Sequence, residues 1–161
     1  MIKVFIEILE KIKQGVFMRL STRARYGVRL MLELALNYNK GNTLLKNIAK
    51  KEGISEKYLS HLVIPLKARG LIVSSRGAHG GYRLAKLPSD INLKSVVQTL
   101  EGGLSLVECV DNPSICGRVS NCPTRTVWEI LDKKISDTLS LITLEDLISF
   151  QLDKKKITEY V

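Results

Sequence analysis

The segment from Leu44 to Arg69 constrains the fold most, because its pattern is that of two helices joined by one tight turn. Ala49 is a small residue where the two helices must cross closely, and Gly53 permits the turn four residues later. Leu59 is placed to pack the second helix back against the first. These requirements are those of a helix-turn-helix, although many other helical hairpins share the spacing.

Capping and helix-breaking residues predict the remaining helices. Ser21 or Thr22 can cap a first helix whose apolar residues cover most of its circumference, so that helix belongs in a core. Ser55 can cap the second helix of the helix-turn-helix, and Gly70 follows it as a stop. Helices are expected over residues 22–39, 44–52, 55–69, 93–100 and 124–141.

Two short β-prone runs, over 71–73 and 82–84, follow the helix-turn-helix. The connector between them, 74–81, is rich in glycine, as a hairpin loop should be. Arg76 lies near its tip, beside glycines that let the backbone approach a phosphate or enter a minor groove. We therefore predict a winged helix-turn-helix: a mainly α fold with a small β-hairpin wing, extended by a long dimerisation helix.

The charge distribution indicates an anionic partner for the front half of the chain. The net charge is +9, and residues 1–100 carry 18 basic and 6 acidic side chains, whereas residues 101–161 carry 7 and 10. A basic module with a helix-turn-helix favours double-stranded DNA, while a solvated basic surface without a partner remains the alternative for each side chain. The candidate DNA contacts are Lys57, Ser60 and His61 on the second helix, Arg76 on the wing, and Arg19 and Arg25 near the first helix.

All three cysteines, Cys109, Cys116 and Cys122, fall within one polar loop, 105–123. Three is too few for a disulfide scaffold, and an odd number argues against simple pairing. Thiolates bind soft metals, so three in a short loop favour an iron–sulfur cluster or zinc. Zinc is the less natural choice, because the two histidines, His61 and His79, lie in the candidate DNA-binding half.

The chain is expected to divide into four parts: an N-terminal extension over 1–17, the winged helix-turn-helix over 18–104, the cysteine loop over 105–123, and a dimerisation helix with a C-terminal segment over 124–161. The extension is a poor secretory signal, and the sequence at Met18 resembles a second translation start. Residues 1–17 are therefore either an extra helix or the product of a wrongly assigned start codon. No apolar run approaches the roughly 20 residues of a membrane span. We expect a cytoplasmic protein without a membrane partner.

The long C-terminal helix carries an apolar seam. Trp128, Leu131, Ile135 and Ile142 fall near a heptad spacing, with Thr138 in the remaining slot. Such a seam can be core, but a long helix this late in a small chain has few partners within it. A homodimer is our preferred interpretation.

Five segments, in this order, resemble the Rrf-two family of IscR/NsrR-type regulators. The resemblance covers 18–148 and comprises residues 18–26, the helix-turn-helix through Ile72, residues 76–84, the triple-cysteine loop and residues 142–147. It implies a homodimeric winged-helix transcription factor that binds palindromic operators. Cysteine-bearing members hold a 2Fe-2S or, in some cases, a 4Fe-4S cluster and sense iron–sulfur status, nitric oxide or redox state.

By this resemblance, Lys57, Ser60, His61 and Arg76 match DNA-contacting positions, and the three cysteines match the cluster ligands. The sequence departs from the family at the fourth ligand. Arg125 stands where IscR-type proteins have a histidine, and Arg25 where NsrR-type proteins have an aspartate from the partner subunit. Neither arginine ligates iron. The remaining candidates for that ligand are Glu108, Asp111, Glu129, a partner-subunit group and an exogenous thiol.

The prediction is therefore a dimeric regulator whose operator affinity is set by an iron–sulfur cluster, 2Fe-2S rather than 4Fe-4S. Two related alternatives stay open: a cluster-free regulator of sulfur or cysteine metabolism with thiol switches, and a regulator with a structural zinc. A thiol-dependent enzyme is not expected, because its nucleophile needs a nearby base and neither histidine lies near the loop in sequence.

Overall fold

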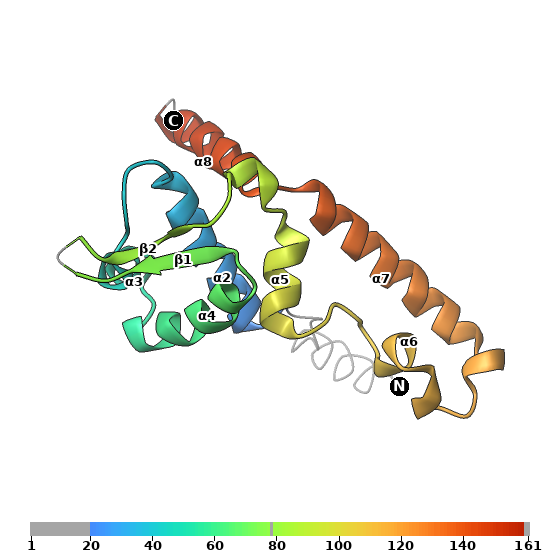
Figure 1. Ribbon diagram of the computed structural model, residues 1–161. Helices are drawn as coiled ribbons and strands as arrows, with labels where there is room; N and C mark the ends of the chain where they lie inside the picture. Colours follow the sequence, from blue (N-terminus) through green and yellow to red (C-terminus); the bar gives the residue numbers. More distant parts are fainter. Residues whose placement is uncertain (1–19, 78, 160–161) are drawn as a thin grey trace, which may run out of the picture.

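The computed structural model describes residues 20–77 and 79–159. The expectations for residues 1–17 and for Arg19 therefore lie outside the described residues. The fold is mainly helical with one antiparallel hairpin, which confirms the predicted class (Figure 1). The elements in order are α2 (Thr22–Leu36), α3 (Leu45–Glu52), α4 (Glu56–Ala68), β1 (Ile72–Ser75), β2 (Gly81–Leu84), η1 (Pro88–Asp90), α5 (Leu93–Glu101), α6 (Glu108–Asp111), η2 (Pro113–Ile115), η3 (Val119–Asn121), α7 (Pro123–Leu141) and α8 (Leu144–Glu159).

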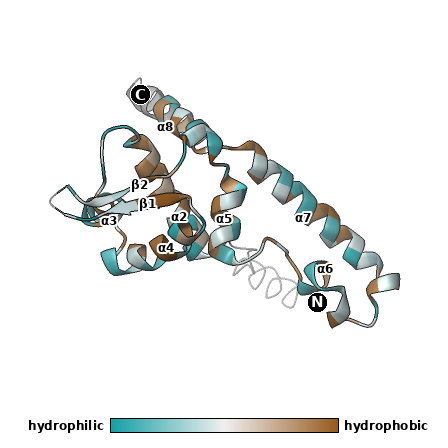
Figure 2. Cartoon of the chain, viewed as in Figure 1, coloured by the Kyte–Doolittle hydropathy of each residue, from teal (hydrophilic) through white to brown (hydrophobic). Residues whose placement is uncertain are grey.

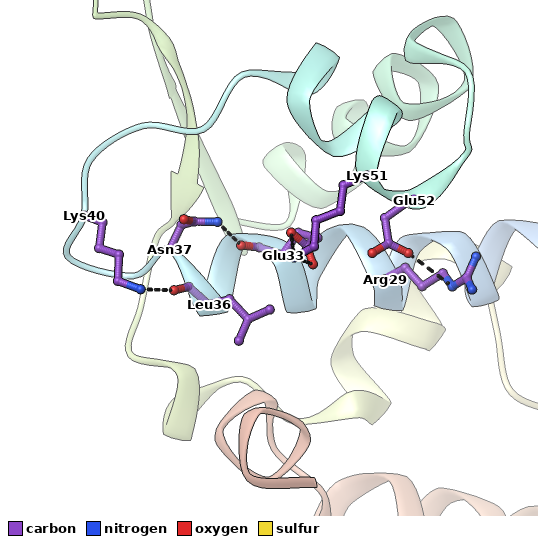
Figure 3. Close-up of polar contacts among 7 residues, drawn as sticks. All are labelled: Arg29, Glu33, Leu36, Asn37, Lys40, Lys51 and Glu52. Atoms are coloured by element: carbon purple, nitrogen blue, oxygen red, sulfur yellow. Dashed lines mark hydrogen bonds and ion pairs between the residues drawn. The ribbon is translucent and has the colours of Figure 1, made fainter. Parts of the chain in front are cut away.

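Local capping explains where the early helices begin and end. The Ser21 Oγ accepts the Ala24 N–H at 3.1 Å at the start of α2. Gly53 ends α3 in the left-handed region, at φ +64°, where glycine is unstrained. The first helix stops at Leu36 rather than at residue 39, because the Asn37 Nδ2 and the Lys40 Nζ donate to its last carbonyls (Figure 3).

The core is built around α2, which packs against α4, α5, α8 and the hairpin. Leu30, Met31 and Leu34 of α2 are essentially inaccessible to solvent. Gly27 lets α2 approach α5 closely, since a Cβ there would overlap the Leu100 side chain. Figure 2 shows brown, apolar stretches along α2 and α4.

Two ion pairs join α2 to the end of α3 (Figure 3). The Lys51 Nζ lies 2.6 and 2.7 Å from the two carboxylate oxygens of Glu33, a residue only 5% exposed. The Arg29 Nε lies 3.4 Å from the Glu52 carboxylate. A buried carboxylate is tolerated only when it is paired, so these contacts hold the first helix of the helix-turn-helix against α2.

The C-terminal segment forms a helix, α8, that packs against α2 and η1. Its start is a capping box: the Thr143 N–H donates to the Asp146 carboxylate at 2.8 Å, and the Asp146 N–H donates to the Thr143 Oγ1 at 3.2 Å. The bond from the Thr143 N–H, together with one from the Thr143 hydroxyl to the same carboxylate at 2.7 Å, lowers the pKa of Asp146. Leu144 is fully buried, and its N–H donates to the Ile91 carbonyl at 3.0 Å. No helix in the described part of the chain is long and apolar enough to cross a bilayer.

Candidate nucleic-acid interface and cysteine segment

Helix α4 presents one buried and one exposed face, as a recognition helix requires. Leu59, Leu62, Val63 and Leu66 are buried against the core. The opposite face carries the predicted residues Lys57, Ser60 and His61, all exposed, at positions i, i+3 and i+4. The structure therefore brings these three predicted contacts together on one free surface.

Two neighbouring residues extend the exposed face of α4. Ile64, which the sequence analysis did not single out, continues the face at i+7 and is 67% exposed. Its spacing of seven residues from Lys57 could have predicted its place on this face. Arg25 is exposed on α2, with its guanidinium carbon 5.8 Å from the Tyr26 ring centroid. Tyr26 in turn meets Tyr58 of α4 edge-on at 5.8 Å, which places Arg25 beside the start of the recognition helix.

Ser55 caps α4, with its side chain accepting the Tyr58 N–H at 3.2 Å. We expect Ser55→Ala to lower the free energy of unfolding by about 1 kcal/mol, because one N-terminal amide loses its acceptor. Urea unfolding measures this loss. Ser89→Ala, at an exposed serine of η1, is the matched control and should be neutral; equal effects of both variants would contradict the capping role.

The wing is longer than predicted, with β1 over Ile72–Ser75 paired to β2 over Gly81–Leu84 in antiparallel register. The Lys67 Nζ donates to the Ser74 Oγ at 2.7 Å, so the wing is tied to the last turn of α4. Arg76 follows the last pair of the ladder, Ser75 with Gly81, and is exposed at the wing tip. In Figure 1 the wing and α4 lie on the side of the molecule opposite α7.

The predicted cysteine loop contains one helical turn, α6, and two 3₁₀ turns, η2 and η3. Cys109 on α6 and Cys122 are half-buried, Cys116 is exposed, and all three are free thiols. Within the described ranges, no three or more His, Cys, Asp or Glu side chains lie close enough to hold a metal ion. The donor chemistry suits an iron–sulfur cluster, but the three thiols do not form a ligand cage in this arrangement.

Arg125 is a structural tie between the cysteine segment and α7. Its Nε donates to the Cys109 carbonyl at 3.1 Å, and its guanidinium lies 2.9 Å from the Glu129 carboxylate. Glu129, a candidate fourth ligand, is therefore already paired. Glu108 and Asp111, two other candidates, line an open pocket of about 840 Å³ between α5, α6 and α7.

The structure changes the ionisation of the Cys122 thiol. A hydrogen bond between its Sγ and the Thr124 Oγ1, at 3.1 Å, lowers the pKa of the thiol. The Arg125 N–H and the nearby charge of Arg118 act in the same direction. A larger thiolate fraction makes this sulfur a better nucleophile and a better metal ligand.

Helix α7 has no buried residue along its 19 positions. Two residues of the predicted seam are used within the chain: Ile135 lines the pocket beside α5, and Ile142 packs on the core. The free apolar face is consequently rotated from the predicted heptad, and Figure 2 shows brown bands along the length of α7. Its large exposed apolar residues are Val127, Trp128, Ile130, Leu131 and Leu141.

Comparison with known proteins agrees with this geometry. Residues 20–149 match the family model "Rrf2: Iron-dependent Transcriptional regulator". The protein Rrf2 of Nitratidesulfovibrio vulgaris is 41% identical over 81% of this chain and 87% of its own. The structure of CymR, the global cysteine regulator of B. subtilis, is 37% identical with a TM-score of 0.70, over 83% of this chain and 98% of that one. The structure of T. potens IscR is 36% identical with a TM-score of 0.70, over 86% and 90%.

The fold and the exposed face of α4 define a winged helix-turn-helix protein, and the solved structures of CymR and IscR share that fold. The chain belongs to the Rrf2 family. It is thus a transcriptional regulator and not an enzyme, and DNA binding follows from the family. Membership does not assign a cluster, because the relatives include both IscR and a cysteine regulator.

Proposed function

We propose that this chain acts as a homodimer that binds a palindromic DNA operator through α4 and the wing. The observation that carries this proposal is the exposed face of α4, with Lys57, Ser60 and His61, on a helix that lies with the wing on the side of the molecule opposite α7 (Figure 1). The buried opposite face fixes the position of the helix in the fold, so its backbone needs no rearrangement when DNA binds. Two such helices in a dimer enter successive major grooves about 34–36 Å apart.

The exposed apolar face of α7 supports the homodimer. Val127, Leu131 and Leu141 would be covered by the same face of a second copy, in the isologous manner of two-fold dimers. The antiparallel or parallel crossing of two such helices sets the spacing of the two winged domains. The cysteine segment is tied to α7 through Arg125. A conformational change in that segment would therefore alter the spacing of the two winged domains and, with it, operator affinity.

Arg76→Ala tests the interface. We expect it to weaken operator binding about tenfold to a hundredfold at fixed salt, because an arginine at a wing tip makes charged contacts in or beside the minor groove. Fluorescence anisotropy on a duplex selected from a random pool by the wild-type protein measures the change. Lys133→Ala, which removes the same charge from an exposed site on α7, should leave affinity nearly unchanged. Unchanged affinity of Arg76→Ala would remove the wing from the interface.

The signal that the regulator receives is proposed to act at Cys109, Cys116 and Cys122. Our first candidate is an iron–sulfur cluster, 2Fe-2S rather than 4Fe-4S, since three thiols within one segment are the donor set that such clusters use. The segment would have to close around the cluster, because the three thiols are not grouped closely enough to hold a metal in the described structure. Coupling between such a site and the operator is of the order of 1–3 kcal/mol.

A second candidate is a thiol switch without a cluster. The lowered pKa of Cys122 favours it, since a thiolate reacts with oxidants and disulfides more readily than a thiol. Similarity to CymR, named as a cysteine regulator, points the same way. The third candidate is a structural zinc bound by the same cysteines. The test below distinguishes it from the other two.

The visible spectrum of the protein purified without oxygen, with its iron and sulfide content, separates these candidates. Visible absorption with matching iron and sulfide supports the cluster, and Cys116→Ala should then abolish the absorption while the protein stays folded. A Cys116→Ala variant that keeps the chromophore would contradict the ligand assignment. A colourless protein that resists reconstitution supports the thiol switch, or zinc if that metal is bound.

A further inference from the structure

The wing tip is held by a contact from outside the wing. Asn42 lies in the connection between α2 and α3, and its side-chain Nδ2 donates to the backbone carbonyl of His79 at 2.8 Å. The next residue, Thr43, pairs with Tyr82 of β2 through two backbone hydrogen bonds of 2.8 and 2.9 Å. The hairpin is thus attached to the helix-turn-helix along its second strand, and at its tip by Asn42.

Close packing leaves little freedom at this junction. Gly81 has φ +141°, and a Cβ there would lie 2.8 Å from the Thr43 carbonyl oxygen and 3.1 Å from the Asn42 Cβ. Glycine at 81 therefore allows the two backbones to meet, because any side chain would separate them. Asn42 is brought within reach of the wing tip by this approach.

The two ends of the Asn42 amide differ in their partners. The Nδ2 has the His79 carbonyl, whereas the Oδ1 is buried and, among the described residues, has no hydrogen-bond partner. The side chain is therefore oriented by its donor end. An aspartate at this position would place a carboxylate oxygen against the His79 carbonyl and would repel it.

Beyond the Ser75–Gly81 pair, the turn that carries Arg76 has one described backbone bond of its own, from the Gly80 N–H to the Gly77 carbonyl at 2.9 Å. Gly77 and Gly80 give this turn a low intrinsic stiffness. The hydrogen bond from Asn42, which lies outside the wing, therefore orders the tip before DNA binds. Ordering a loop in advance improves affinity, because the entropy cost is not incurred on binding.

We propose that Asn42 is a positioning residue for operator binding: it holds the wing tip at His79 so that Arg76 is presented to DNA in one orientation. This inference rests on the proposed function, since it requires that the wing contacts the operator. Asn42→Ala should weaken operator binding about three- to tenfold, the effect of losing one hydrogen bond that pre-orders a loop.

A double-mutant cycle on the intact protein tests the proposal. Asn42→Ala should lower affinity in the wild-type background and cause no further loss in Arg76→Ala, because both changes remove the same contact. Asn42→Asp, of equal size but without the donor, should weaken binding at least as much as Asn42→Ala. Gln98→Ala, at an exposed amide on α5, is the control and should have no effect.

Hydrogen exchange of the free protein supplies a second readout that does not depend on DNA. The Gly80 amide should exchange faster in Asn42→Ala while the amides of α2 and the urea midpoint stay unchanged. Additive losses in the cycle, or unchanged affinity and exchange, would overturn the proposal. A wild-type protein that binds no operator would overturn the proposed function itself, whereas weaker binding by Arg76→Ala with unchanged binding by Asn42→Ala would overturn only the role assigned to Asn42.

Discussion

If the proposed homodimer forms through α7, Val127→Asp combined with Leu131→Asp is expected to convert it into monomers and to lower operator affinity about a hundredfold or more. The two residues lie one turn apart on the exposed face of α7. A second copy seated there would bury two carboxylates without partners, which costs several kcal/mol. A monomer reaches only one half-site, so it also loses about half of the phosphate contacts.

Analytical ultracentrifugation and anisotropy on the selected operator measure the two effects together. Ser89→Asp adds a carboxylate at an exposed position of η1, outside α7, and should preserve both the proposed dimer and the affinity. A double variant that remains dimeric would place the interface elsewhere. A monomeric variant with full operator affinity would instead contradict the two-half-site mode of binding.

Gly27→Val is expected to destabilise the fold by about 3 kcal/mol or more. The position is buried where α2 crosses α5, and a new side chain would meet Leu100, which is only 1% exposed. Leu100 cannot move into solvent without leaving the core, so the helices must separate or the core must repack.

Urea unfolding followed by circular dichroism gives this free energy. Gly117→Ala is the matched control, because a Cβ at Gly117 meets nothing within 4 Å and should change the stability by less than about 0.5 kcal/mol. If Gly27→Val unfolds at the same urea concentration as the wild type, Leu100 relocates without cost and the close crossing has no energetic role.

The recognition helix and the wing could be predicted because their determinants are local. Ser55 lies next to the helix it caps, Gly53 supplies a turn through its own φ, and the glycines of 74–81 separate two strands that pair with each other. In each case the partners are close in sequence. Side-chain type and spacing therefore predicted which face of α4 would be exposed, including Lys57 and His61.

The arrangement of the three thiols and the orientation of the apolar face of α7 could not be predicted from local patterns. Proximity in sequence predicted that three thiols could wrap one centre, yet in the described chain no three metal-binding side chains lie close enough together to hold a metal ion. The heptad on α7 predicted one seam, but Ile135 and Ile142 face the chain's own domain. A helical period does not tell which of two neighbouring partners an apolar face will meet.

The sequence by itself determined the bounds of α3, α4 and α5 to within one residue, the hairpin and the family, because caps, turns and periodic burial depend on neighbours a few residues away. Tertiary structure decided which distant groups meet: Glu33 with Lys51, Gly27 with Leu100, and Asn42 with His79, which is 37 residues away. These contacts depend on how whole helices pack in three dimensions. Many pairings of distant residues are compatible with one pattern, and close packing selects among them.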